Sequence, residues 1–294
     1  METTLLTADA PSKINLYLRV TGKREDGYHL LESLFLPLAD PADHIAIDRD
    51  GAPGAVTLAT SRLDVPGGKD NLGARAALRW AAKAGVLPSW DIQIVKNIPV
   101  AAGMGGGSSD AAAVMKLLND QAGAPLTPEA LAEAALALGA DVPFFLDPRP
   151  AVMRGVGEIA EPLDFPLPEI PLLLVAPGFP VSAAEAYRKL DPARIAPVDE
   201  AWRAEFLNAL RTGAWEKLGK LLRNDLAPGV YAKYPVLPLL EKELYASGAL
   251  GVALTGSGPT LFALFATRAE VEEACRDWKS RYPEFQILAA RQLR

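Results

Sequence analysis

The sequence predicts an α+β protein built from two domains. Its 294 residues are enough for two ordinary domains. Segments that alternate between apolar and polar residues, as strands do, are interspersed with Ala-rich segments of helical character. After Arg154 the composition changes to a Pro-rich stretch, PLDFPLPEIP, without any period. We therefore expect one domain over residues 1–160 and a second over residues 161–294.

The first half contains several expected strands. Residues 13–20, KINLYLRV, alternate with period two, which predicts a half-buried strand whose polar face carries Lys13, Asn15, Tyr17 and Arg19. A turn over GKREDGYH and an apolar run over residues 30–38 follow. Three short strands are then expected over residues 44–49, 55–60 and 91–96.

Helices are expected in both halves of the chain. Residues 71–85 are Ala-rich and end on a glycine, and residues 127–138 begin with Thr127 as a plausible N-cap. The second half reads as a strand, LLLVAPG, and then helices around residues 197–224 and 236–247. After these helices we expect two strands, a helix and a last strand up to the C-terminus.

Composition excludes several classes of protein. Half the residues are hydrophobic and 22% are charged, which is typical of a packed protein. With 30 Lys and Arg against 36 Asp and Glu, the net charge of −6 argues against nucleic-acid binding, although a small phosphorylated ligand needs only a local cradle. A lone Cys275 excludes a disulfide framework, and two histidines leave no H-E-x-x-H zinc site.

The chain also lacks membrane and export signals. Its beginning, METTLLTADAPSK, has no basic segment followed by a long apolar one, so no signal peptide is expected. The sequence contains no run of about 18 apolar residues, so no membrane span is expected. We expect a cytoplasmic, soluble globular protein without membrane or nucleic-acid association.

Residues 102–113, AGMGGGSSDAAA, carry the strongest chemical signal. Glycines allow backbone N–H groups to approach an anion, and the helix that follows adds unpaired N–H groups and a positive dipole end. Ser108 and Ser109 supply hydroxyl groups for a phosphate oxygen or a metal ion. The alternative is a flexible turn capped by serine. Four glycines and two serines ahead of an Ala-rich helix favour phosphate binding.

This segment matches none of the common nucleotide motifs. The chain has no G-x-x-x-x-G-K-[ST] sequence, and Ser108 stands where a dinucleotide fingerprint requires its third glycine. The H-R-D and D-F-G triplets of protein kinases are absent as well. A phosphate loop of another kind remains.

Three motifs together resemble those of the GHMP kinase superfamily. PVAAGMGGGSS, from Pro99 to Ser109, resembles its second motif, and ALTGSGPTLFALF, over residues 253–265, resembles its third. PSKINLYLRVTGKREDGYHLLESLF, over residues 11–35, is similar to the first motif of one family, the 4-diphosphocytidyl-2-C-methyl-D-erythritol kinases. Ser12 in place of the usual Ala, and Met104 in place of Leu, remove no functional group.

The resemblance implies a fold and a reaction. The fold is the two-lobed GHMP kinase fold, with an N-terminal lobe like domain 2 of ribosomal protein S5 and a ferredoxin-like C-terminal lobe. The reaction phosphorylates the 2-hydroxyl of 4-diphosphocytidyl-2-C-methyl-D-erythritol, in the non-mevalonate pathway of isoprenoid biosynthesis. ATP is the co-substrate, Mg²⁺ accompanies it, and ADP is released.

The resemblance also implies catalytic and nucleotide-binding residues. Asp141 orients or deprotonates the attacking hydroxyl, and Lys13 stabilises the moving charge. Without the resemblance, Asp141 reads as a helix N-cap or turn residue and Lys13 as a solvated lysine at a strand end. The expected ATP-binding residues are Pro99, Val100, Ala101, Ala102, Gly103, Met104, Gly105, Gly106, Gly107, Ser108, Ser109, Lys96 and Asn71.

The expected substrate-binding residues are Asn15, Tyr28, His29 and Tyr187. Tyr28 and His29 would recognise cytosine, because an aromatic ring stacks on a base and an imidazole hydrogen-bonds its polar edge. Tyr187, from the second domain, would stack on the opposite face of the cytosine. Ser109 is the candidate Mg²⁺ ligand.

Two other functions share the phosphate loop. The diphosphomevalonate decarboxylase branch of the superfamily makes a phosphorylated intermediate that then undergoes elimination. The G-Y-H element, and the cytidine-sized pocket that it implies, argue against that branch. A non-catalytic ligand sensor would bind nucleotide without turnover. The presence of both Lys13 and Asp141 argues against a sensor.

Overall fold

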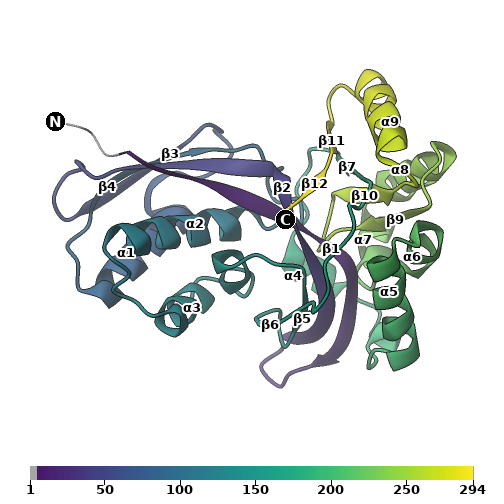
Figure 1. The fold of residues 1–294 in the computed structure, drawn as a ribbon, viewed down its shortest axis with the longest axis horizontal. Coiled ribbons are helices and arrows are strands. Elements are labelled where there is room, and N and C mark those ends of the chain that lie inside the picture. The colour runs from purple at the N-terminus through teal and green to yellow at the C-terminus, as the bar shows by residue number, and fades with distance from the viewer. Residues whose placement is uncertain (1–4, 294) are drawn as a thin grey trace. The chain divides into compact units, whose positions relative to one another are not determined.

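The computed structural model describes residues 5–293, which form two compact units built from interleaved segments (Figure 1). The first unit comprises residues 5–12, 41–98 and 105–148, and the second comprises residues 13–40, 99–104 and 149–293. Two long strands, β1 (Leu6–Lys23) and β2 (His29–Asp48), contribute to both units. The chain crosses between the units for the last time after residue 148, and a domain boundary near residue 160 stays a prediction.

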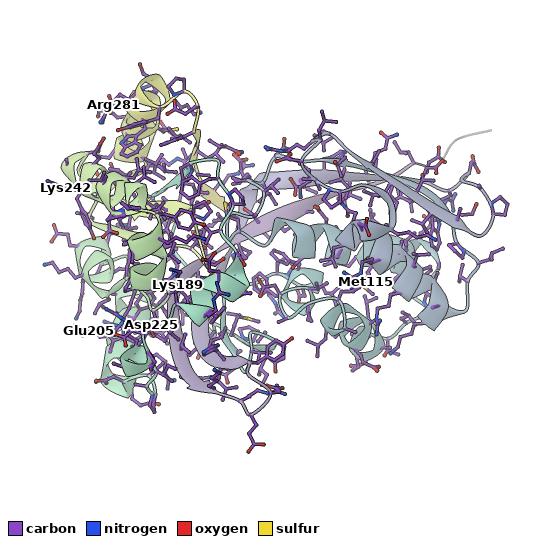
Figure 2. All side chains as sticks on the ribbon, turned by 180° about the vertical axis from the view of Figure 1, so that it is seen from behind. Met115, Lys189, Glu205, Asp225, Lys242 and Arg281 are labelled. Atoms are coloured by element: carbon purple, nitrogen blue, oxygen red, sulfur yellow. The ribbon has the colours of Figure 1, made fainter. Side chains whose placement is uncertain are left out.

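The first unit combines parts of β1 and β2 and two further strands with a cluster of helices. Strand β3 (Ala55–Thr60) runs parallel to β4 (Ser89–Val95), and β4 is antiparallel to residues 44–48 of β2. The α-helices are α1 (Leu72–Ala84), α2 (Gly106–Gln121) and α3 (Pro128–Leu136), with 3₁₀ turns η1 (Gly68–Asp70) and η2 (Pro143–Leu146). Each α-helix contacts the other two, and Met115 is buried in α2 (Figures 1 and 2).

Local signals place the ends of these helices as expected. The side chain of Asn71 caps α1, which ends at Gly85 in the left-handed conformation with φ of 69°. Thr127 caps α3, as predicted. The expectation of a separate strand at residues 44–49 is wrong, because these residues continue β2 from the apolar run at residues 30–38.

The second unit contains the rest of the first sheet. Strand β5 (Ala151–Arg154) pairs with residues 33–35 of β2 and with β6 (Ile159–Pro162). Strand β8 (Arg223–Asn224) runs parallel to β1, and β12 (Arg291–Gln292) pairs with β2.

A second, antiparallel sheet has the order β11 (Gln286–Ala289), β7 (Leu172–Ala176), β10 (Leu261–Leu264), β9 (Gly251–Leu254). The helices of the unit are α4 (Ala183–Arg188), α5 (Glu200–Thr212), α6 (Trp215–Leu221), α7 (Ala227–Lys233), α8 (Val236–Ala246) and α9 (Arg268–Arg281), with the 3₁₀ turn η3 (Pro192–Arg194). Helix α9 packs on β7 and β11, and α8 packs on β9 and β10. The predicted strand β7, the helices around residues 197–224 and 236–247, and the final order strand, strand, helix, strand are confirmed by β7, α5, α6, α8, β9, β10, α9 and β11. The short elements α4, β8, α7 and β12 were not predicted.

The burial of residues 13–20 differs from the prediction. We expected one exposed polar face, but every residue of this stretch is buried. On one face Tyr17 packs edge-on against Trp202 and Phe206 of α5, at ring distances of 5.1 and 5.0 Å. On the other face Leu18 belongs to the core of the second unit. Helix packing over the polar face is a tertiary event that strand periodicity does not reveal.

Charged groups buried on this strand are paired. The Nε of Arg19 donates to Oδ2 of Asp225 at 3.0 Å, and the backbone N–H of Val20 donates to the same oxygen at 2.9 Å (Asp225 is labelled in Figure 2). This pairing ties β1 to the end of β8. Among the described residues, no helix is long and apolar enough to cross a membrane.

Candidate active site

Lys13 lies on β1 with its ammonium group held by two oxygen atoms. Its Nζ donates to Oδ1 of Asn15 at 2.7 Å and to the carbonyl oxygen of Gly103 at 3.1 Å. Its backbone N–H donates to the carbonyl oxygen of Met104 at 3.0 Å, and its Nζ lies 4.6 Å from the ring centre of Phe35. Only 4% of Lys13 is exposed. The solvated-lysine reading is therefore wrong, and the Gly-rich segment lies directly against Lys13.

The side-chain amide of Asn15 is already occupied by protein groups. Its Nδ2 donates to Oγ of Ser33 at 2.8 Å, and its Oδ1 accepts from Lys13 and from Oγ1 of Thr255 at 3.3 Å. Its backbone N–H donates to Oγ1 of Thr255 at 2.9 Å. The predicted placing of Asn15 beside Lys13 is confirmed. Its contact with a substrate stays a prediction.

Helix α2 begins inside the Gly-rich segment. Its N-cap is Gly105, in the left-handed conformation with φ of 76°, and no side chain caps the first turn. Backbone N–H groups at this end are therefore available to an anion, which the positive end of the helix dipole also favours. Gly107 is exposed, and a Cβ atom on it would meet nothing within 4 Å. This geometry suits a phosphate group.

The remaining expected ATP-binding residues are divided between the units. Residues 99–104 lie in the second unit, whereas Asn71, Lys96 and residues 105–109 lie in the first. Oδ1 of Asn71 accepts from the N–H of Gly73 at 2.8 Å, and its Nδ2 donates to the carbonyl oxygen of Pro66 at 2.9 Å. Asn71 thus has a structural role in capping α1, and its nucleotide contact stays a prediction.

Lys96 joins two buried carboxylates. Its Nζ donates to Oδ2 of Asp110 at 2.7 Å and to Oδ2 of Asp43. Oδ1 of Asp43 accepts from the N–H groups of Asn97, at 2.6 Å, and Ile98, at 2.8 Å. Burial raises the pKa of Asp110 to about 7, against the lowering effect of Lys96. This cluster connects β2, the segment after β4 and the first turn of α2.

Two buried oxygen atoms at the start of α2 are candidates for a metal ion. Oγ of Ser109 and Oδ1 of Asp110 have no hydrogen-bond partner among the described residues. Mg²⁺ prefers oxygen ligands and binds through few protein groups when it accompanies a nucleotide. Within the described part of the chain, no group of three or more His, Cys, Asp or Glu side chains could hold a metal ion by itself. The oxygen chemistry of Ser109 and Asp110 fits Mg²⁺.

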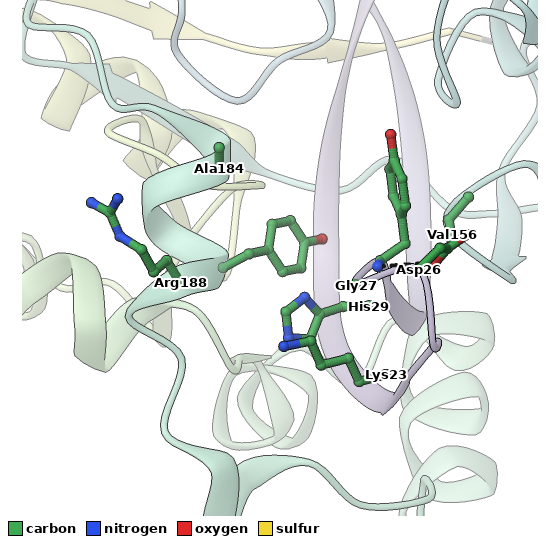
Figure 3. Close-up of a pocket in the computed structure, with 9 residues that line it drawn as sticks. Lys23, Asp26, Gly27, His29, Val156, Ala184 and Arg188 are labelled. Carbon is green, nitrogen blue, oxygen red and sulfur yellow. Dashed lines mark hydrogen bonds between the residues drawn. The ribbon is translucent and has the colours of Figure 1, made fainter.

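A pocket of about 640 Å³ lies in the second unit between the β1–β2 hairpin and α4 (Figure 3). Its lining residues are Lys23, Asp26, Gly27, Tyr28, His29, Val156, Ala184, Tyr187 and Arg188. Figure 3 shows Ala184 and Arg188 on α4, across from Lys23 and His29. All three aromatic residues expected to bind substrate are therefore brought together.

The parallel rings in this pocket are His29 and Tyr187. Their centres are 5.3 Å apart and their planes differ by 20°. Tyr28 also lines the pocket and is 65% exposed, and the enclosure of cytosine between Tyr28 and Tyr187 stays a prediction. Partial burial and then the nearby charge of Lys23 lower the pKa of His29 below its usual 6.5. The imidazole is thus neutral at pH 7 and offers both a donor and an acceptor.

Asp141 lies in the turn between α3 and η2. It is half-buried and belongs to the first unit, whereas Lys13 belongs to the second. The turn is closed by a hydrogen bond from the N–H of Val142 to the carbonyl oxygen of Gly139 at 3.1 Å. The turn position predicted for Asp141 is confirmed, and its catalytic role stays a prediction.

Four polar residues of these sites were not singled out from the sequence. Thr255 lies inside the motif ALTGSGPTLFALF, which could have pointed to it. Asp110 directly follows the two serines of the Gly-rich segment. Ser33 and Asp43 carry no sequence signal, because their roles depend on which residues β2 brings beside them.

The chain matches two family descriptions. Residues 71–147 match the GHMP kinases N terminal domain, and residues 206–284 match GHMP kinases C terminal. A 4-diphosphocytidyl-2-C-methyl-D-erythritol kinase from Pelotomaculum thermopropionicum is 40% identical over 289 residues, covering 98% of each chain. One from Geobacter sulfurreducens is 39% identical over 278 residues, covering 93% of this chain and 96% of the relative.

Solved structures show the same likeness. A crystal structure of 4-(cytidine 5'-diphospho)-2C-methyl-D-erythritol kinase has a TM-score of 0.81 and 33% identity, covering 98% of this chain and 99% of the other. Homoserine kinase from Cytophaga hutchinsonii has a TM-score of 0.75 at 16% identity over 99% and 97% of the two chains, which shows a shared fold alone. The predicted two-lobed GHMP kinase fold is thus confirmed, and the chain belongs to the family of 4-diphosphocytidyl-2-C-methyl-D-erythritol kinases.

Proposed function

We propose that this chain transfers the γ-phosphate of ATP to the 2-hydroxyl of 4-diphosphocytidyl-2-C-methyl-D-erythritol and releases ADP. The reaction is a step of non-mevalonate isoprenoid biosynthesis. The observation that carries the proposal is the 40% identity to a kinase of that name over 98% of both chains. We infer that the enzyme acts in the cytoplasm on this small molecule, without nucleic acid or an obligate protein partner.

The phosphate groups of ATP bind at the start of α2. The N–H groups of Gly106, Gly107 and Ser108 donate to phosphate oxygens there, and no side chain competes for them. Phosphoryl transfer asks a protein mainly for positioning and charge stabilisation. Lys13 provides the positive charge, and Asp141 orients the acceptor hydroxyl and takes its proton.

Ser109 Oγ would hold Mg²⁺, with Oδ1 of Asp110 as a second oxygen. Both atoms are buried and lack a partner in the described part of the chain, which supports this assignment. When bound, the ion neutralises charge that develops on the phosphate oxygens.

The cytosine binds in the pocket between the β1–β2 hairpin and α4. Tyr28, His29 and Tyr187 supply ring faces for stacking, and neutral His29 hydrogen-bonds to the polar edge of the base. The parallel placing of His29 and Tyr187 supports stacking on one of these two rings.

A coupled ADP-release assay tests the proposed function. The wild-type chain should turn over the cytidylyl substrate and leave mevalonate, homoserine and methylerythritol phosphate unphosphorylated. Asp141→Asn should lower kcat by about 10²–10⁴-fold, because an amide cannot accept the proton. The same change at the exposed Asp120 is the matched control. Turnover of mevalonate in preference to the cytidylyl substrate would refute the assigned substrate, and Asp141→Asn with more than half the wild-type kcat would remove Asp141 from the mechanism.

A further inference from the structure

A single buried hydroxyl group contacts two oxygen atoms that accept hydrogen bonds from the Lys13 ammonium. Oγ1 of Thr255 lies 3.3 Å from Oδ1 of Asn15 and 3.4 Å from the carbonyl oxygen of Gly103. Both of these oxygen atoms also accept from the Lys13 Nζ. The Thr255 side chain is completely buried, directly after the end of β9.

Several further contacts fix this hydroxyl group and its neighbours. Thr255 Oγ1 accepts from the backbone N–H of Asn15 at 2.9 Å, which ties the turn after β9 to strand β1. The other end of the Asn15 amide donates to Ser33, whose hydroxyl in turn donates to the carbonyl oxygen of Tyr17 at 2.6 Å. Oδ1 of Asn15 therefore has one orientation, facing Lys13. A rotated amide would place its NH₂ group against the ammonium.

We propose that Thr255 is a positioning residue that sets the place of the Lys13 ammonium through Asn15 and the carbonyl group of Gly103. The proposal rests on the role of Lys13 in the proposed function. It extends the reacting site to the turn after β9, more than 200 residues away in the sequence. Without this hydroxyl, Asn15 and Gly103 lose the group that joins them, and the ammonium has a wider range of positions.

A pair of threonines on the same hairpin makes the test specific. Thr255→Val removes the hydroxyl at constant shape. Thr260→Val makes the same change directly before β10, at another completely buried residue whose hydroxyl has no hydrogen-bond partner in the described part of the chain. Thr255→Ser keeps the hydroxyl and should restore the wild-type behaviour.

Steady-state kinetics with both substrates is the first measurement. We expect Thr255→Val to lower kcat about tenfold or more, with both KM values within about twofold of wild type, because a misplaced charge affects the transition state more than binding. Thr255→Ser and Thr260→Val should keep kcat within about threefold. Equal losses in the two valine variants, or a wild-type kcat in Thr255→Val, would overturn the proposal.

The acetylation rate of Lys13 by acetic anhydride, followed by mass spectrometry, is a measurement that needs no turnover. Loss of the Thr255 hydroxyl should expose the amine and raise this rate at least about threefold, whereas Thr260→Val should leave it unchanged. A wild-type protein without kinase activity would contradict the proposed function, and the acetylation rates would still decide the role of Thr255. Identical rates in all variants would refute it.

Discussion

Gly103 lies so close to the turn after β9 that a Cβ atom on it would stand 2.2 Å from the carbonyl oxygen of Thr255. Its φ of 76° also disfavours any other residue. Gly106 is tight as well, since a Cβ atom there would lie 3.2 Å from Cγ2 of Ile98. Gly107 alone of these three has open space around it. These three glycines of one motif therefore differ in their surroundings, and of the three Gly107 has room for a side chain without a close contact.

Gly107→Val should weaken ATP binding by about tenfold or more and leave binding of the cytidylyl substrate unchanged. The added side chain fills the space through which a phosphate group approaches the first N–H groups of α2. Titration calorimetry with each ligand separately is the measurement. The unfolding temperature is the control, and unchanged ATP affinity would count against phosphate binding at this helix end.

His29 should titrate with a pKa below 6.5, and Lys23→Gln should raise that pKa. Burial and the nearby ammonium of Lys23 both disfavour the charged imidazole. Because the folded-state pKa is lowered, the contribution of neutral His29 to stability is lost as the pH falls from about 6.5 through the folded value. NMR titration measures this, with the His29→Gln spectrum identifying the signal among the two histidines. A pKa at or above 6.5 would contradict the structure.

At the scale of elements, a buried charge cluster connects β2, the segment after β4 and the start of α2 within the first unit. Lys96 follows β4, Asp43 lies in β2 and Asp110 in the first turn of α2. The side chains are almost completely buried, so each charge depends on its partners for solvation. The cluster therefore fixes the direction in which α2 leaves the Gly-rich segment.

Lys96→Met should lower the free energy of unfolding by about 3–5 kcal/mol, because it leaves two buried carboxylates without their cation. Lys83→Met is the matched control, since the Lys83–Glu133 ion pair is solvent-exposed and should be worth about 1 kcal/mol or less. Urea denaturation without nucleotide separates this effect from any contact with ATP. Equal losses in the two variants would show that the cluster adds no stability of its own.

At the scale of the whole molecule, the second unit depends on an early part of the chain. Residues 13–40 supply strands to it, and its core includes Leu18 and Val20 together with residues of β7, β9 and β10. The buried carboxylate of Asp225 is neutralised in part by Arg19. A C-terminal half cut at the predicted boundary loses all of these partners.

A fragment of residues 161–294 should therefore fail to fold by itself. Its core would be incomplete, and Asp225 would be buried without Arg19 and the N–H of Val20. Circular dichroism during urea denaturation should show no cooperative transition for the fragment, in contrast to the full chain. A cooperative transition would mean that the C-terminal half is an independent domain.

The sequence by itself determined the features that arise within a few residues. Asn71 and Thr127 mark the helix starts, because a capping side chain bonds to N–H groups two or three residues away. Gly85 marks a helix end for a similarly local reason. Alternation in residues 13–20 predicted the strand and placed Asn15 beside Lys13. The Gly-rich motif predicted a helix start suited to phosphate.

Only the tertiary structure decided which distant residues meet. Thr255 and Gly103 reach Lys13 and Asn15 across 90 to 240 residues of sequence, and the ring of His29 stacks on that of Tyr187. Helix α5 packs on Tyr17 and buries the polar face of residues 13–20, which was predicted to be exposed. Such contacts depend on strand register and helix packing, where a shift of one residue turns a different side chain toward the partner, and no local pattern records that choice.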